Sequence, residues 1–341
     1  MDNQTVIKAA IQNVVSKGIR DIRRDPNRSI RKLVDLGMQF GTGRYQQTFF
    51  TDAHKTLKKR NSAYYTLVTS LIRNVDPKTL ETLGFSVGYM SWTMGAKVIR
   101  AYEKKEGFNV PWTVLVDLSR PAETILDLEQ LVEQGQCLGI YTYFLFVGEH
   151  TPDPDSMLSL AERFGSSAFF LVSVDAAMNA RMAASDELLC NTLIVPRGGD
   201  PACPEIGGVL SQKKRMFGLN CEYNAVNADT LLSDAFLQNV VEQGYPFLFL
   251  IPSLDCDPAT RERVNAAVLA LRVSGRYPLF PIDLYNDLQQ VDHIISDEHC
   301  MLALGADGSV LYPKGVQGLT FQGRTLEELI RLTMPRVHHH R

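Results

Sequence analysis

The chain has 341 residues, of which 45% are apolar and 21% are charged, and its formal net charge is −3. This composition is typical of a soluble globular protein. The longest apolar runs, residues 140–147 and 247–251, are far too short to cross a bilayer, and residues 1–10 lack the pattern of a signal peptide. We therefore expect a cytoplasmic protein without a membrane partner.

The charge is distributed unevenly along the chain. Residues 1–60 carry thirteen Lys or Arg and five Asp or Glu, whereas the remainder carries 22 and 33. Such asymmetry indicates either a partner-binding surface or solvated helix faces, and the sequence leaves both open. No nucleic-acid-binding module accompanies the basic segment, so we expect no nucleic-acid partner.

The first hundred residues read as helices. Apolar residues recur at helical spacing after Thr5 and again from Ile30, and Asp76-Pro77 is a specific helix start. We expect an N-terminal helical region over residues 1–109. Its glycines at 84, 88 and 95 indicate either close helix packing or an interruption of the helix.

From Val110 onward, short apolar runs alternate with amphipathic helices. The predicted strands cover residues 113–117, 140–147, 168–174, 192–195, 217–223 and 247–251. Six such repeats predict a parallel sheet that is covered by helices and curled into a full or partial barrel. Because ligands bind at the C-terminal ends of barrel strands, the loops after these strands are the candidate sites.

After Gly275 the alternation is expected to stop. Residues 278–287 and 299–312, with a turn at 306–308, predict a small β appendage, and residues 325–333 predict a final helix. The expected domains are 1–109 (helical), 110–276 (barrel) and 277–341 (C-terminal extension).

The six cysteines are at least thirteen residues apart and show no zinc-ligand spacing. We expect most of them to be free structural thiols and expect no metal site. The loop after the first strand, LSRPAE at residues 118–123, contains no cysteine.

Several segments, taken in order, match a known pattern. They are VPWTVLVD at 110–117, VGEH at 147–150, VPRG at 195–198, YNAVN at 223–227, PLFPIDLYND at 278–287 and LGADGSVLYP at 304–313. Over residues 28–330 this order resembles the radical S-adenosylmethionine (SAM) proteins with a SPASM-type extension. The resemblance implies an α/β fold: a partial (β/α)6 TIM-like barrel with an N-terminal helical region and a small C-terminal SPASM-like α+β extension.

The resemblance fails at the cofactor. Members of that family carry three closely spaced cysteines after the first strand to hold a 4Fe-4S cluster, and residues 118–123 have none. Pro313 stands where a cysteine for the auxiliary cluster would lie. Because an iron–sulfur cluster needs thiolates, we expect no 4Fe-4S cluster and no catalytic residue.

The resemblance also implies a remnant ligand site. Gly148 and Glu149 match part of the Gly-Gly-Glu-Pro motif that helps hold the amino group of SAM, Arg197 replaces the family's glutamate, and Asn227 resembles its strand-end asparagine. The residues alone leave other roles open. Gly148 would only permit a turn, Arg197 would be solvated, and Asn227 would cap the next helix.

Two functional hypotheses follow. The first is a non-catalytic radical-SAM-like pseudoenzyme that acts as a binding subunit for a protein partner, either an active homologue or another enzyme subunit, or as a homo-oligomer. The alternative is a cluster-free enzyme or sensor that binds SAM or another small metabolite at the barrel mouth.

Overall fold

The computed structural model describes residues 3–40, 44–59, 61–151, 154–185, 190–296, 298, 300–314, 316 and 318–335. The six predicted strands are present as β1 (Thr113–Asp117), β2 (Thr142–Val147), β3 (Ala168–Ser173), β4 (Thr192–Val195), β5 (Leu219–Tyr223) and β6 (Phe247–Pro252). Three further strands follow them: β7 (Phe280–Asp283), β8 (Leu302–Gly305) and β9 (Val310–Tyr312). The expected α/β class is therefore confirmed.

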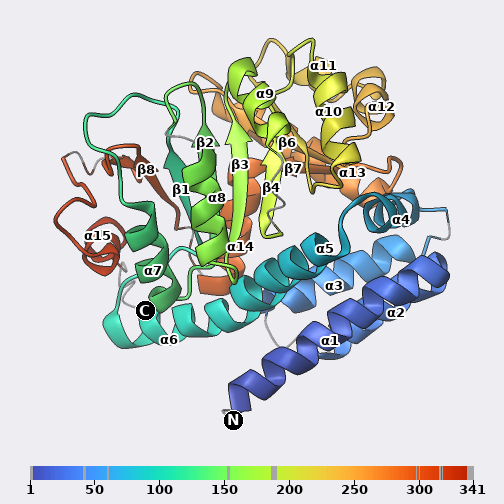
Figure 1. Cartoon of the computed structure of the whole chain (residues 1–341), viewed down its shortest axis with the longest axis horizontal. Coiled ribbons are helices and arrows are strands. Elements are labelled where there is room, and N and C mark those ends of the chain that lie inside the picture. The colour runs from blue at the N-terminus through green and yellow to red at the C-terminus, as the bar shows by residue number, and fades with distance from the viewer. Residues whose placement is uncertain are drawn as a thin grey trace.

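The helices divide into two groups. The N-terminal group comprises α1 (Asn3–Arg24), α2 (Pro26–Phe40), α3 (Arg44–Leu57), α4 (Tyr64–Asn74), α5 (Pro77–Phe85), the π-helix η1 (Ser86–Gly95) and α6 (Ala96–Glu106). The second group alternates with the strands and comprises α7 (Leu128–Leu138), α8 (Pro154–Arg163), α9 (Ala176–Ala184), α10 (Cys203–Gln212), α11 (Ala228–Leu231), α12 (Asp234–Glu242), α13 (Pro258–Ser274), α14 (Leu284–Ser296) and α15 (Leu326–Thr333). Figure 1 shows helices α7–α10, α12 and α13 around the strands, with the N-terminal group on the lower side of the molecule.

The strands form two sheets. One has the order β4-β3-β2-β1-β8-β9 and the other the order β5-β6-β7, and every pairing except β8–β9 is parallel. Isolated parallel bridges, Ile194↔Phe217 and Arg197↔Asn220, join β4 to the segment of β5. The parallel strands therefore follow one another in chain order, and their C-terminal ends lie at a common edge.

The C-terminal segment corrects one expectation. The repeats do not stop at Gly275, because β7 pairs in parallel with β6 and β8 pairs in parallel with β1. The predicted turn at 306–308 is present between β8 and β9, with Gly308 at φ 78°. Residues 280–305 thus extend the β/α pattern instead of forming a separate appendage, while the boundaries of the three expected domains stay a prediction.

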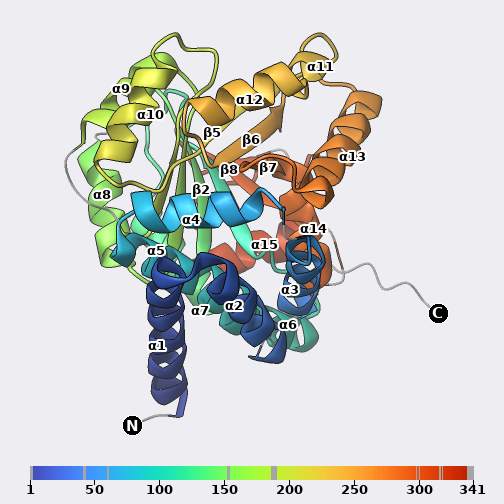
Figure 2. The same ribbon diagram turned by 90° about the vertical axis from the view of Figure 1, so that its right-hand side faces the viewer.

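The N-terminal helices have a small core of their own. Its buried members, from α1 to α4, are Ile19, Ile22, Ile30, Leu57, Tyr65 and Ile72. The remaining buried side chains form one large core among the strands and the helices that cover them. Figure 2, turned by 90°, shows α1, α2, α3 and α6 together on the same lower side.

Gly95 shows why the N-terminal helical region needs a glycine at the end of η1. A Cβ on Gly95 would lie 2.2 Å from the backbone oxygen of Gly139, and a Cβ on Gly139 would lie 2.6 Å from the backbone oxygen of Gly95. The end of η1 therefore packs backbone to backbone against the end of α7. By contrast, nothing lies within 4 Å of a Cβ built on Gly88. Of the two alternatives left open by the sequence, close packing explains Gly95.

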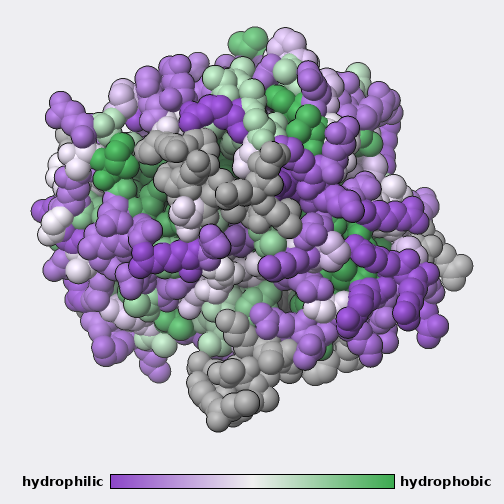
Figure 3. All heavy atoms as spheres, viewed as in Figure 1, coloured by the Kyte–Doolittle hydropathy of each residue, from purple (hydrophilic) through white to green (hydrophobic). Residues whose placement is uncertain are grey.

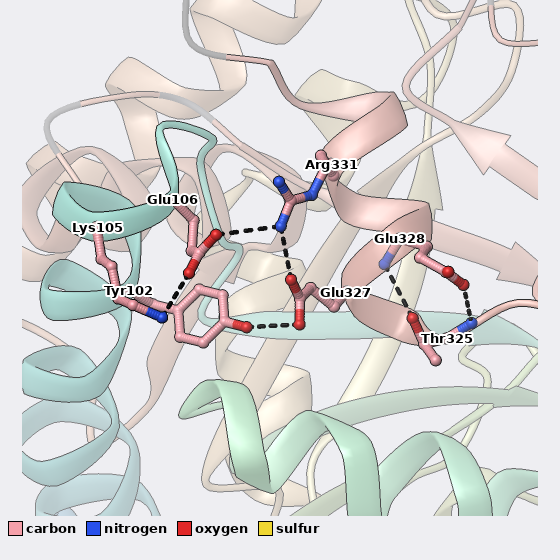
Figure 4. A network of polar contacts seen from close by, with 7 residues as sticks. All are labelled: Tyr102, Lys105, Glu106, Thr325, Glu327, Glu328 and Arg331. Atoms are coloured by element: carbon pink, nitrogen blue, oxygen red, sulfur yellow. Dashed lines mark hydrogen bonds and ion pairs between the residues drawn. The ribbon is translucent and has the colours of Figure 1, made fainter.

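A polar network holds the last helix against α6 (Figure 4). The hydroxyl of Tyr102 donates to Glu327 Oε2 at 2.5 Å, and Arg331 pairs with Glu327 and with Glu106 at 2.7 and 3.2 Å. Burial and the neighbouring Glu327 raise the pKa of Tyr102 to about 12. The predicted final helix is confirmed as α15, which Thr325 and Glu328 start with a reciprocal capping box.

One ionisable side chain is completely enclosed near the starts of the strands. Asp292 of α14 has 0% exposure, and its Oδ1 accepts a hydrogen bond from the backbone N–H of Trp112 at 3.0 Å. Its Oδ2 has no hydrogen-bond donor at ordinary distance among the residues that the structure describes, although the thiol of Cys300 lies close enough to lower the pKa of this carboxyl. Burial raises the pKa of Asp292 well above its ordinary value, and the negative charge of Glu103 adds to this rise.

No helix within the described ranges is long and apolar enough to span a bilayer.

Candidate functional site

The predicted ligand residues lie along one edge, at the C-terminal ends of the strands. The backbone N–H of Glu149, after β2, donates to Asp175 Oδ2 at 2.8 Å, just past β3. Arg197, after β4, donates from Nη1 to the carbonyl oxygen of Val174 at 2.6 Å. The structure therefore brings the loops after β2, β3 and β4 into contact.

The same chain of contacts continues to β5. Arg197 Nη2 lies 3.3 Å from Glu222 Oε2, and Asn227 Nδ2 donates to the backbone oxygen of Glu222 at 3.0 Å. Gly148, Glu149, Arg197 and Asn227 are thus linked through Asp175, Val174 and Glu222. The carboxylate of Glu149 does not join this chain, because its ion-pair partner is His150 at 3.4 Å and its side chain is 71% exposed.

Gly148 is required for space. A Cβ at this position would lie 2.8 Å from Asp175 Oδ2, 2.9 Å from Val174 Cγ2 and 3.1 Å from Ser119 Cβ. Gly148 is not among the glycines with positive φ. A side chain at position 148 would therefore require the side chains of Asp175, Val174 and Ser119 to shift, which favours glycine there. That Gly148 also permits the turn into the loop stays a prediction.

Asn227 occupies the N-cap position of α11 but does not cap it. Its side chain makes no cap hydrogen bond, and its Oδ1 instead accepts from the backbone N–H of Asn224 at 2.9 Å. The expected capping role is wrong. The side chain fixes the loop between β5 and α11, which keeps the backbone of Glu222 in place.

Polar side chains in the loop after β1 pair with one another. Asp117 Oδ1 accepts from the backbone N–H and the hydroxyl of Ser119 at 3.1 and 2.5 Å, and Arg120 Nε lies 3.2 Å from Asp117 Oδ2. Leu118 is fully buried. A carboxylate, a hydroxyl and a guanidinium satisfy one another in this loop, and these residues do not fit an iron–sulfur cluster, which needs thiolates.

Most cysteines elsewhere in the chain are buried thiols. Cys203, Cys221, Cys256 and Cys300 are buried. Burial raises the pKa of Cys221 to about 12 and that of Cys203 above its ordinary value, so both remain thiols at neutral pH. Among the described residues, no group of three or more His, Cys, Asp or Glu side chains is placed to hold a metal ion.

Tyr285 connects opposite parts of this edge. It follows β7, and its pKa is raised to about 12, chiefly by burial; the charges of Asp117 and Glu222 contribute to this rise, whereas Arg261 opposes it. Carboxylates from β1 and β5 therefore act on the same phenol. The sequence offered a signal for Glu222, because it is the one charged residue in the otherwise buried strand β5.

A second enclosed carboxyl lies beside Tyr285. Asp283, at the end of β7, is fully buried and accepts hydrogen bonds from Asn286 at 2.6 Å and from Tyr223 at 3.3 Å. Burial raises the pKa of Asp283 to about 6. The burial of this carboxyl keeps it from direct contact with a ligand.

Asn220 connects three strands beneath this edge through hydrogen bonds. The sequence analysis did not predict this role. Its Nδ2 lies within 3.0 Å of the backbone oxygens of Ser173, Val195 and Pro196, which belong to the ends of β3 and β4. A single side chain thus ties β5 to two neighbouring strand ends. Nothing in the local pattern LNCEY indicates these distant partners.

Replacing Asn220 tests that role. We expect Asn220→Ala to lower the free energy of unfolding by about 2 kcal/mol, because buried carbonyl oxygens lose their donor. Urea denaturation followed by circular dichroism measures the change. Asn286→Ala is the comparison, because the side-chain amide of Asn286 donates a hydrogen bond to one carboxylate, that of Asp283. Equal losses in the two variants would contradict a special role for Asn220.

We compared the chain with known protein families, proteins and structures. No family model and no curated protein matches this chain. One solved structure with some likeness is that of a variant HPPK-DHPS from Plasmodium falciparum with STZ-DHP, at 10% identity and a TM-score of 0.31. The match covers 62% of this chain and 50% of that one. At that TM-score the likeness carries no argument about this protein.

Proposed function

We propose that this protein is a non-catalytic binding subunit built on a radical-SAM-like scaffold without an iron–sulfur cluster. The observation that carries this proposal is the loop after β1, where Asp117, Ser119 and Arg120 satisfy one another in place of thiolate ligands. The partner is another protein, either an active homologue or a different enzyme subunit, in the cytoplasm.

The strand order supports the scaffold part of the proposal. Parallel strands follow the order β8-β1-β2-β3-β4 and then β5-β6-β7, and isolated bridges join the two sheets at β4 and β5. We propose a curled, barrel-like arrangement in which β7 and β8 extend the six expected strands.

Reconstitution tests the loss of the cluster. We expect the full chain, treated anaerobically with iron and sulfide, to hold no stoichiometric iron and to form no 5′-deoxyadenosine from SAM and a reductant. Iron analysis, visible absorbance and product chromatography provide the measurements. Cys137→Ser is the control, because Cys137 is an exposed thiol that could collect iron adventitiously. About four irons per chain in both proteins, together with product, would refute the proposal.

A second candidate is a cluster-free small-molecule binder at the same edge. The half-exposed pair of Arg197 and Glu222, at 44% and 48% side-chain exposure, favours it because both charges are reachable by a ligand. A ligand that carries an anionic and a cationic group would match this pair, and SAM is one such compound.

Calorimetry separates the two candidates. Titration with SAM and with small dicarboxylates should show heat only if the second candidate is correct, and Arg197→Ala should then abolish it. Arg163→Ala is the matched control, because Arg163 forms a comparable exposed pair with Glu129 on the outer helices. No heat with any compound leaves the partner-subunit proposal, which capture of a specific protein from native extract then tests.

A further inference from the structure

The junction of α1 and α2 concentrates exposed positive charge. We call it the basic elbow, residues 17–32; its exposed cations are Lys17, Arg20, Arg23, Arg24, Arg28, Arg31 and Lys32. The same sixteen-residue stretch holds two acids, Asp21 and Asp25. Figure 3 shows hydrophilic side chains over the lower right of the molecule, where α1 and α2 lie.

An open hollow lies on the α2 side of the elbow. Arg28, Arg31, Lys32 and Asp35 line it, and its volume is about 430 Å³. These positions recur three and four residues apart, so they share one face of the helix. Arg28 lies in the first turn of α2, where the backbone dipole adds positive potential.

The acids nearby are already engaged. Asp35 Oδ1 lies 3.1 Å from His54 Nδ1, Asp52 pairs with Lys55 at 3.2 Å, and Asp25 accepts from the backbone N–H of Arg28. Arg28 and Lys32 form no ion pair within the part of the chain that the structure describes. Like charges one helical turn apart repel each other, so a bound anion would stabilise this face.

We propose that the hollow of the basic elbow binds a small anion that carries phosphate groups. Guanidinium groups donate paired hydrogen bonds to phosphate oxygens, and an ammonium adds a point charge, so Arg28 and Lys32 suit a phosphate-bearing anion better than a single carboxylate. The elbow belongs to the N-terminal helices, away from the strand ends, so this site is independent of the proposed function.

Inorganic tripolyphosphate is the probe. We expect the full chain to bind it in calorimetry at low salt, with affinity that falls as salt rises. The double variant Arg28→Gln/Lys32→Gln should lose about tenfold or more in affinity, since two of three cations are removed. Glutamine retains helix propensity, and circular dichroism verifies that α2 persists.

A matched double variant excludes a general charge effect. Lys97→Gln/Lys104→Gln removes the same two charges from exposed positions on α6 and should change the affinity by about twofold or less. Equal weakening in both double variants, or no binding by the unmodified chain, would overturn the proposal.

Vesicles identify the source of the phosphate. Flotation with phosphatidylcholine vesicles, with and without a phosphatidylinositol phosphate, is run on both double variants. Binding to tripolyphosphate alone assigns a free phosphate compound, and additional binding to the phosphoinositide vesicles that Arg28→Gln/Lys32→Gln removes assigns a lipid headgroup. Vesicle binding that this variant retains would place the lipid contact elsewhere and overturn the headgroup assignment.

Discussion

Gly95→Ala should lower the free energy of unfolding by about 3 kcal/mol, near the upper end for overpacking a well-packed site. The added Cβ would meet the backbone oxygens of Gly139 at 2.2 Å and Met90 at 2.9 Å. Neither atom can rotate away, since both belong to the backbone of packed helix ends. Relief would require η1 and α7 to separate. Urea denaturation monitored by circular dichroism measures the loss.

Gly88→Ala is the matched control for this prediction. Gly88 lies in the same π-helix, but nothing is within 4 Å of an added Cβ. Alanine also has the higher helix propensity, by about 1 kcal/mol, so this variant should be as stable as the parent or more stable. A comparable loss in both variants would show that η1 requires glycine for its backbone conformation and not for the contact with Gly139.

Asp292→Asn should stabilise the protein, and increasingly so as the pH rises. Burial raises the folded-state pKa of Asp292, so the folded protein holds this proton more tightly than the unfolded chain does. Stability is therefore lost as the pH rises above the unfolded value of about 3.9, at up to about 1.4 kcal/mol per pH unit. Asparagine removes this loss while its Oδ1 still accepts the N–H of Trp112.

The measurement is urea denaturation of both proteins between pH 4 and pH 8. The difference should be small at pH 4 and should grow toward pH 8. Asp257→Asn is the control with the opposite sign, because hydrogen bonds to the backbone N–H and side chain of Thr260 lower the pKa of Asp257. That carboxylate stabilises the fold above its unfolded pKa, and its contribution is lost as the pH falls. A pH-independent effect of Asp292→Asn would contradict a raised pKa.

The sequence predicted the strands whose apolar runs are long and rich in β-branched or aromatic residues. Strand β2 carries TYFLFV and strand β6 carries FLFLIP, and both were found with small shifts at their ends. Strand β7 is only FPID, and its proline and aspartate also suit a turn, so its place beside β6 was missed. Partners of that kind are set by the whole sheet and not by the local pattern.

The sequence indicated where candidate site residues lie in the chain, but it did not indicate which side chains contact them. The resemblance singled out Gly148 and Arg197, and both lie where parallel strands end at one edge. The roles of Glu222 and Tyr285 depend on side chains that converge from segments more than sixty residues apart. The apolar pattern carries no information about such convergence, and the hydrogen bonds of Asn220 were missed for the same reason.

The pairing of β1 with β8 has a consequence for how the protein is made. Strand β1 leaves the ribosome long before residues 302–305 have been translated, so one of its edges stays without its neighbour for most of synthesis. Pairing across so long a stretch of chain is slow to form, and an unpaired strand edge invites contact with other nascent chains. We therefore expect this protein to depend on chaperones until translation has passed β8, and to aggregate when production outpaces them.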